Sequence, residues 1–107
     1  MITMVQREYA IRLTVNRRKF RRVLIDPHYE KRHPDMEDRT ILSLVRTLED
    51  AEHIAKYVTV AGFEIYVTEP VFQAEKLYRL VWTTHPSENY IGVINAFRRK
   101  RAKILER

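Results

Sequence analysis

The amino-acid sequence predicts an α+β protein in which one or two helices pack on one face of an antiparallel β-sheet. Three observations lead to this fold class. Residues 6–25 contain two apolar runs around a basic turn, residues 35–50 carry an apolar stripe with helical spacing, and residues 63–97 contain three runs rich in β-branched and aromatic side chains. A chain of 107 residues is long enough for one domain. We therefore expect a single domain over 1–107 with a basic C-terminal tail.

The first predicted element is a β-hairpin with a strongly basic tip. Apolar side chains alternate with polar ones over residues 6–15, which is typical of a half-buried strand. A turn at 16–19 leads to a second strand at 20–25. Cations around the aromatic Phe20 suit a phosphate backbone and a stacked base, and the alternative is a solvated tip. The candidate RNA-binding cations of this hairpin are Arg17, Arg18, Lys19, Arg21 and Arg22.

A short segment between two prolines, 26–34, follows the hairpin and is either an ordered loop or a single helical turn. It holds the densest set of proton-transfer and anion-binding groups in the chain, including His28, Arg32 and His33. No carboxylates accompany the histidines at a known ligand spacing, and the chain has no cysteine, so we expect neither a metal site nor a cofactor. The alternative is a surface loop that precedes a helix.

The helix predicted over 35–50 starts with Asp35 as its N-cap, because acidic residues follow it in the first turn. Apolar residues then recur at i, i+3, i+4 and i+7, which places them on one face. They are Ile41, Leu44, Val45 and Leu48. The stripe extends further, so the helix either continues to residue 57 or is followed by a second short helix, and Gly62 ends it.

The C-terminal part of the chain is predicted as a three-strand meander. A strand over 63–69 ends at Pro70, and the connector 71–75 leads to a hairpin of two apolar runs, 77–84 and 90–97. The last run is apolar at nearly every residue. We therefore expect it to form the middle strand of the sheet, covered on both faces.

Gly92 interrupts the last strand and indicates a bulge or a close approach by another group. The strand then leads into four consecutive cations, so a block of positive charge is expected at one edge of the sheet. These cations are Arg98, Arg99, Lys100 and Arg101. The remaining residues, 102–107, are predicted to form a frayed helical tail.

The charge distribution divides the chain into three parts. The net charge is +6 over residues 1–25, −6 over 26–75 and +6 over 76–107. This asymmetry favours a polyanionic partner, with nucleic acid as the first candidate, and the alternative is that the charge serves solubility. No apolar run reaches membrane-spanning length and no signal peptide is evident, so we expect a cytoplasmic protein without a membrane partner.

Two short patterns resemble a known superfamily. The first is His28-x-x-x-Arg32 just before an amphipathic helix, and the second is a last strand that reads Ile91-Gly-Val-Ile-Asn-Ala-Phe-Arg-Arg. Over residues 24–101 the order of elements resembles the RelE/ParE-like toxins, the barnase-like ribonuclease group that includes the BrnT-type toxins. The N-terminal basic hairpin has no counterpart in that pattern, and two arginines rather than one follow the last strand.

The resemblance implies the toxin of a type II toxin–antitoxin pair, a metal-independent mRNA endonuclease that acts on RNA either free or on the ribosome. Its partner would be an acidic antitoxin protein. One alternative is a non-catalytic nucleic-acid-binding or regulatory protein with the same fold. Another is a toxin that acts on a protein target such as gyrase.

Cleavage of RNA without a metal needs a base, an acid and cations on the phosphate. We expect His28 to act as base or acid, with Arg32 and Arg98 clamping the phosphate in one pocket. For the second proton-transfer role the candidates are His33, Glu30 and Tyr29, and we expect Tyr29 and His33 at the rim of that pocket. Arg99 and Lys100 complete the predicted RNA-binding set.

Overall fold

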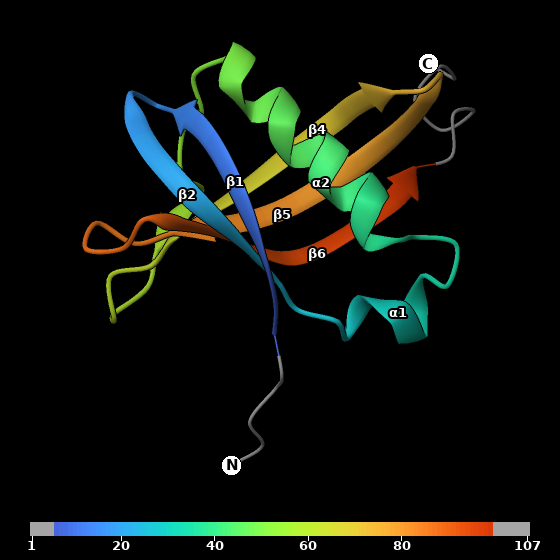
Figure 1. Cartoon of the computed structure of the whole chain (residues 1–107), viewed down its shortest axis with the longest axis horizontal. Coiled ribbons are helices and arrows are strands. Elements are labelled where there is room, and N and C mark those ends of the chain that lie inside the picture. Colours follow the sequence, from blue (N-terminus) through green and yellow to red (C-terminus); the bar gives the residue numbers. More distant parts are fainter. Residues whose placement is uncertain (1–5, 100–107) are drawn as a thin grey trace.

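The computed structural model describes residues 6–99 and shows an α+β fold (Figure 1). Six strands form one mixed sheet, and two α-helices lie between the second and third strands in the chain. The predicted α+β class is therefore confirmed. Lys100 and the tail predicted over 102–107 lie outside the described residues.

The N-terminal hairpin consists of strand β1, Arg7–Val15, and strand β2, Arg18–Ile25. Its turn contains only Asn16 and Arg17, whose φ angles are 52° and 69°. Two central residues with positive φ are the signature of a type I′ turn, whose twist matches that of the flanking strands. Because the turn needs only two residues, β2 starts earlier than the predicted strand.

Of the two alternatives for residues 26–34, the structure has the single helical turn, helix α1, Tyr29–Arg32. The helix predicted over 35–50 is divided into helix α2, Asp38–Arg46, and a 3₁₀ turn, η1, Thr47–Asp50. The N-cap of α2 is Glu37 rather than the predicted Asp35. Neither alternative for residues 51–57, a continued helix or a second short helix, is found, because the backbone becomes extended at Ala51 after η1.

The remaining four strands are β3, Tyr57–Val58, β4, Glu64–Gln73, β5, Lys76–Thr84, and β6, Tyr90–Arg99. Strand β3 replaces the end of the predicted helix. Gly62, predicted to end that helix, instead lies in the turn between β3 and β4 with φ of 95°.

Strand β4 continues through Pro70, so the prediction that this proline ends the strand is wrong. Within residues 6–99, the one strand beside the outer edge of β4 is β3, which pairs with Glu64 and Ile65. Pro70 therefore lies where the outer edge of β4 carries no ladder that would need an N–H, which is where sheets tolerate proline.

The sheet order is β1-β2-β6-β5-β4-β3, so β6 lies inside the sheet between β2 and β5. Its pairing with β5 is antiparallel, but residues 90–93 pair with 22–25 of β2 in parallel. The prediction of a purely antiparallel sheet is therefore wrong. The chain between β2 and β6 holds both helices and three strands, and such a long crossover lets two strands meet in the same direction.

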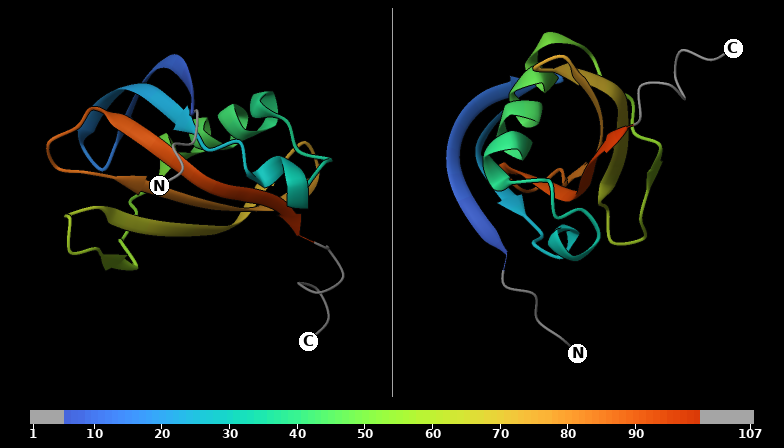
Figure 2. Two further views of the ribbon diagram at one scale, coloured as in Figure 1. Left: turned by 90° about the horizontal axis from the view of Figure 1, so that it is seen from below. Right: turned by 90° about the vertical axis from the view of Figure 1, so that its right-hand side faces the viewer.

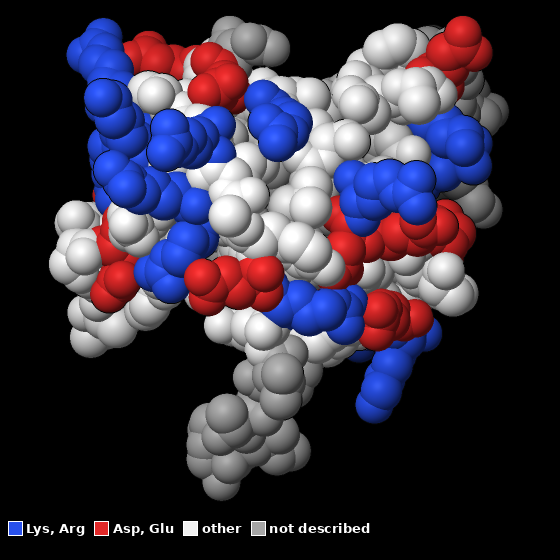
Figure 3. Space-filling model, viewed as in Figure 1, with Lys and Arg blue, Asp and Glu red and all other residues white. Residues whose placement is uncertain are grey.

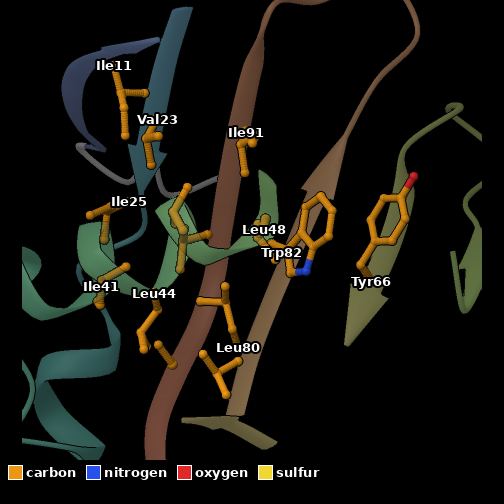
Figure 4. Packing of buried hydrophobic residues seen from close by; sticks show 14 of the residues in the cluster. Ile11, Val23, Ile25, Ile41, Leu44, Leu48, Tyr66, Leu80, Trp82 and Ile91 are labelled. Atoms are coloured by element: carbon orange, nitrogen blue, oxygen red, sulfur yellow. The ribbon is translucent and has the colours of Figure 1, made fainter. Parts of the chain in front are cut away.

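The hydrophobic core lies between α2 and the concave face of the curved sheet (Figure 2). The apolar stripe of α2 packs on large side chains of the inner strands, with Leu44 and Trp82 fully buried (Figure 4). Trp82 also stacks on Tyr66, with ring centroids 4.0 Å apart. The opposite face of β6 is only half-buried at Asn95 and Phe97, so the expected burial of this strand on both faces is incomplete.

Gly92 is a position of close approach. A Cβ atom there would lie 3.0 Å from Cγ2 of Thr83 on β5. The irregularity in the β5–β6 register falls slightly later, where Val81 pairs with Asn95 and Trp82 pairs with Val93. Ile94 is thus the extra residue of the bulge, which lies two residues after the glycine.

Candidate functional site

Helix α1 covers the part of β6 that β2 leaves unpaired. The last contact of the β2 end is the Asp26 N–H, which donates to the Val93 carbonyl at 3.2 Å. Beyond it the His33 ring stacks on Phe97, with centroids 4.8 Å apart and ring planes inclined by 19°. The segment with the predicted histidines is therefore held beside the end of β6, which Figure 2 shows from two sides.

His28 stands at the start of α1 beside a carboxylate. Its N–H donates to Oδ1 of Asp26 at 3.0 Å, and its Nδ1 lies 3.4 Å from the same oxygen. The side chain is half-exposed, at 48%. A solvent-accessible histidine oriented by a carboxylate is suited to proton transfer.

Arg32 and Arg98 are both exposed, and neither forms an ion pair with a carboxylate that the structure describes. Arg32 ends α1, whereas Arg98 follows Phe97 on β6. Successive side chains of a strand point to opposite faces. Arg98 therefore points away from the face of β6 on which the His33 ring stacks, so the strand separates these two predicted site residues.

Two candidates for proton transfer are engaged elsewhere. Tyr29 is buried, with 2% of its surface exposed, and its hydroxyl donates to Asp38 at 2.7 Å. Glu30 accepts a hydrogen bond from Arg7 at 2.8 Å. The expectation that Tyr29 lies at the rim of a catalytic pocket is therefore wrong, because its ring belongs to the core.

Three of the predicted RNA-binding arginines form contacts within the fold. Arg18 donates to the carbonyls of His85 and Glu88 at 2.8 and 3.2 Å and lies 3.3 Å from a carboxylate oxygen of Glu64. Arg22 donates to the Asn89 side chain and lies over a tyrosine ring. Arg99 shares the carboxylate of Glu69 with Arg79.

The outward cations of the hairpin form a different group. Arg12, Lys19 and Arg21 line one surface pocket of about 360 Å³, and none of the three pairs with a carboxylate whose position is described. Glu49 also lines this pocket, but its carboxylate accepts the Thr14 N–H at 2.8 Å. Figure 3 shows Lys and Arg side chains gathered over the hairpin, whereas blue and red are intermixed over α1.

Phe20 is not available for base stacking. Only 2% of its surface is exposed, and the Arg18 guanidinium lies 4.9 Å from its ring centroid. The expectation of a stacked base on this aromatic is therefore wrong. What the hairpin presents to a ligand is positive charge, at Lys19, Arg21 and Arg12, together with Arg17 at the tip, whose side chain is 90% exposed and 3.7 Å from Glu52.

The densest polar cluster is centred on Asp38, the first residue of α2. One carboxylate oxygen accepts from Arg7 Nε at 2.6 Å and from the Tyr9 hydroxyl. The other accepts from Arg7 Nη2 at 3.0 Å and from the Tyr29 hydroxyl at 2.7 Å. The cluster joins β1, α1 and α2, and four donors saturate the carboxylate.

The hydrogen bonds from Arg7 lower the pKa of Asp38 to about 2, assisted by those from Tyr9 and Tyr29 and opposed by burial. The same contacts raise the pKa of Arg7, and hydrogen bonding to Asp38 also raises the pKa of Tyr9. Desolvation raises the pKa of Tyr29. A carboxylate with every acceptor position occupied is a structural clamp rather than a free base.

Sequence reasoning missed Arg12 and Asp38. The sequence contains a signal that could have identified Arg12 as a surface cation. Arg12 alternates with the buried Ile11 and Leu13, so it must point outward beside the basic turn. The sequence contains no such signal for the cluster at Asp38, because the partners of Asp38 lie 9 to 31 residues away in the sequence.

Among residues 6–99 no group of three or more His, Asp or Glu side chains is arranged to hold a metal ion. No helix in that part of the chain is long and apolar enough to cross a membrane. No protein-family model, no curated protein and no solved structure matches the chain.

Proposed function

We propose that the protein binds RNA through the outward face of the β1–β2 hairpin. The observation that carries this proposal is the pocket lined by Arg12, Lys19 and Arg21, three cations without a described carboxylate partner. Cations that are not neutralised within the fold are free to replace the counterions of a phosphate backbone. The net charge of +6 on residues 1–25, and again on residues 76–107, strengthens the attraction between the protein and RNA further.

In this proposal the protein contacts the phosphates of the RNA rather than its bases. Phe20, the aromatic residue in the lining of this pocket, is buried, so the pocket offers charge without a stacking platform. Phosphate contacts position a nucleic acid without selecting its sequence. We therefore expect little discrimination between RNA sequences.

The test is a fluorescence-anisotropy titration of a labelled single-stranded RNA at several salt concentrations. The variant Arg12→Gln/Lys19→Gln/Arg21→Gln should bind more weakly, and the slope of log K against log salt should fall by about 2, because each phosphate contact to a single strand contributes about 0.7. The matched control Arg39→Gln/Arg46→Gln/Lys76→Gln removes three exposed cations from other elements. If both variants lose affinity equally, net charge rather than this surface explains the binding.

A second candidate is the one the resemblance implies, a metal-independent endoribonuclease of the toxin type, acting in the cytoplasm and neutralised by an acidic antitoxin. It is supported by His28 beside Asp26, with Arg32 four residues later at the end of α1 and His33 stacked on Phe97 of β6. In this proposal His28 transfers the proton and Arg32 binds the phosphate. Arg98 serves the same phosphate only if RNA reaches around the end of the strand.

The catalytic candidate is tested by an RNA-cleavage assay with His28→Ala. General acid–base catalysis is worth about 10²–10⁴-fold, so the rate should fall by that factor while RNA affinity is unchanged. Lys31→Ala, an exposed neighbour on α1, is the control. Absence of cleavage by the wild-type protein, with RNA binding intact, would leave the non-catalytic function.

A further inference from the structure

The segment 54–60 exposes four large apolar side chains. Ile54 and Val60 have relative exposures of 91% and 108%, and Tyr57 and Val58 of 57% and 59%. Single apolar residues are common on protein surfaces, but four large exposed ones within seven residues exceed such scatter, and exposed apolar surface of this kind marks an interaction site. None of the four residues lines the basic pocket of the hairpin, and none has a role in the proposed RNA binding.

The backbone of this segment is held in place. The Lys56 N–H donates to the Ile65 carbonyl at 2.7 Å, and the Thr59 N–H donates to the Phe63 carbonyl at 2.8 Å. Before it, the Asn16 side chain bonds both the N–H and the carbonyl of His53, at 2.8 and 2.9 Å. A partner that binds here meets a backbone already fixed in one arrangement, which lowers the entropic cost of association.

The segment also forms the last strand of the sheet. Strand β3 ends the strand order and pairs only with β4, so its outer edge has no strand beside it in the described chain. In the left view of Figure 2 this short yellow-green strand lies at the lower margin of the molecule. Proteins usually protect such edges with charges, prolines or bulges, and within 54–60 the one charged residue is Lys56.

The charges near this edge indicate which kind of partner binds it. Lys56 is exposed within the segment, and Arg17, with a 90% exposed side chain, projects from the hairpin tip that Asn16 ties to residue 53. Glu52, 3.7 Å from Arg17, offsets part of this charge. A second copy of the chain would bring the same cations, Lys56 and Arg17, to the interface, whereas an acidic partner gains from their field.

We propose that the β3 edge binds an extended, apolar and acidic segment of a partner protein, which adds to the sheet as a further strand beside Tyr57 and Val58. In this mode the backbone groups of the edge supply hydrogen bonds, and alternate apolar side chains supply specificity. The proposal goes beyond the RNA-binding function and concerns a different edge of the sheet, with the charge of Arg17 at the hairpin tip available to both.

The probes are labelled synthetic peptides titrated by fluorescence anisotropy. The first alternates valine or isoleucine with glutamate, the second replaces each glutamate by lysine, and the third replaces each apolar residue by serine. The first should bind and the other two should bind at least tenfold more weakly. Equal binding of all three, or binding of none, overturns the proposal.

The site is located with protein variants. Val58→Ser/Val60→Ser should weaken binding of the first peptide at least tenfold, while Phe72→Ser, another exposed apolar residue that lies on β4, should leave it unchanged. RNA affinity should be the same in both variants, so failure here is distinguishable from failure of RNA binding. An unchanged peptide affinity in the double variant overturns the proposal.

Strand addition itself is tested with two N-methylated forms of the first peptide, methylated at alternate residues in the two registers. Only one register removes the hydrogen bonds to β3, because successive amides point to opposite sides of a strand. One form should therefore bind and the other should not. Equal binding by both, or a concentration-dependent dimer of the protein that Val58→Ser/Val60→Ser abolishes in sedimentation, overturns the proposal.

Discussion

The two edges of the sheet differ in how they meet their surroundings. At one edge, β1 buries Ile11, Leu13 and Val15 against the core and is joined to other elements by polar contacts. At the other edge, β3 leaves both of its residues exposed, and apolar neighbours on either side are exposed as well. The same sheet therefore has one protected edge and one open edge.

The protected edge is held by two carboxylates that reach it from the helical segment. Asp38 binds Arg7 and Tyr9 near the start of β1, and Glu49 accepts the Thr14 N–H near its end. These contacts join the edge strand to α2 and η1. The open edge has no such contact from a helix within residues 6–99, and its fixed backbone comes from β4 and from Asn16.

This difference separates stability from recognition within one fold. Polar contacts that saturate Asp38 lower the free energy of the folded state but leave no group free to bind a ligand. Apolar side chains left exposed at β3 contribute little to folding, but they offer area to a partner. We therefore expect substitutions at the β1 edge to lower the free energy of unfolding, and substitutions at the β3 edge to weaken partner binding with little effect on stability.

The largest effect is expected for Asp38→Ala. It removes the acceptor of four hydrogen bonds and leaves the Arg7 guanidinium and the buried Tyr29 hydroxyl without their partner. The loss in the free energy of unfolding should be roughly 2–3 kcal/mol, measured by urea denaturation. At the open edge, Val60→Ala should change it by less than about 0.5 kcal/mol. Equal effects at both edges would show that contacts at the β1 edge stabilise the fold no more than the side chains at the β3 edge do.

A smaller loss in the free energy of unfolding is expected at acidic pH. The pKa of Asp38 is lowered from its ordinary 3.8 to about 2, so its contribution to stability is fully present above pH 4 and is lost as the pH falls towards 2. Chemical denaturation at a series of pH values should show this loss. In Asp38→Asn the decline over this interval should be shallower, and an identical profile in both proteins would show that other carboxylates govern acid unfolding.

Much of the local structure could be predicted from the sequence. The alternation at Ile11, Leu13 and Val15 identified the buried face of β1, and the spacing of Ile41, Leu44, Val45 and Leu48 identified the buried face of α2. These patterns depend only on residues that are near one another in the chain, so a period of two or of 3.6 is enough to indicate them.

The partners of the charged residues could not be predicted in this way. Arg18 and Arg22 looked like free cations, yet their partners at Glu64, Glu88 and Asn89 lie 46 to 70 residues away. Arg12 was overlooked, although it lines the basic pocket. An arginine that pairs within the fold and one that faces solvent have the same sequence signature, because the difference lies in which strands are adjacent.

The sequence by itself determined the α+β class, the basic hairpin and the amphipathic helix, because each follows from local spacing and composition. The tertiary structure alone decided the parallel pairing of β2 with β6, the position of α1 beside β6 and the saturation of Asp38. It also decided which edge of the sheet is covered. These features depend on contacts between distant parts of the chain, whose register is set by packing of the whole core rather than by any one segment.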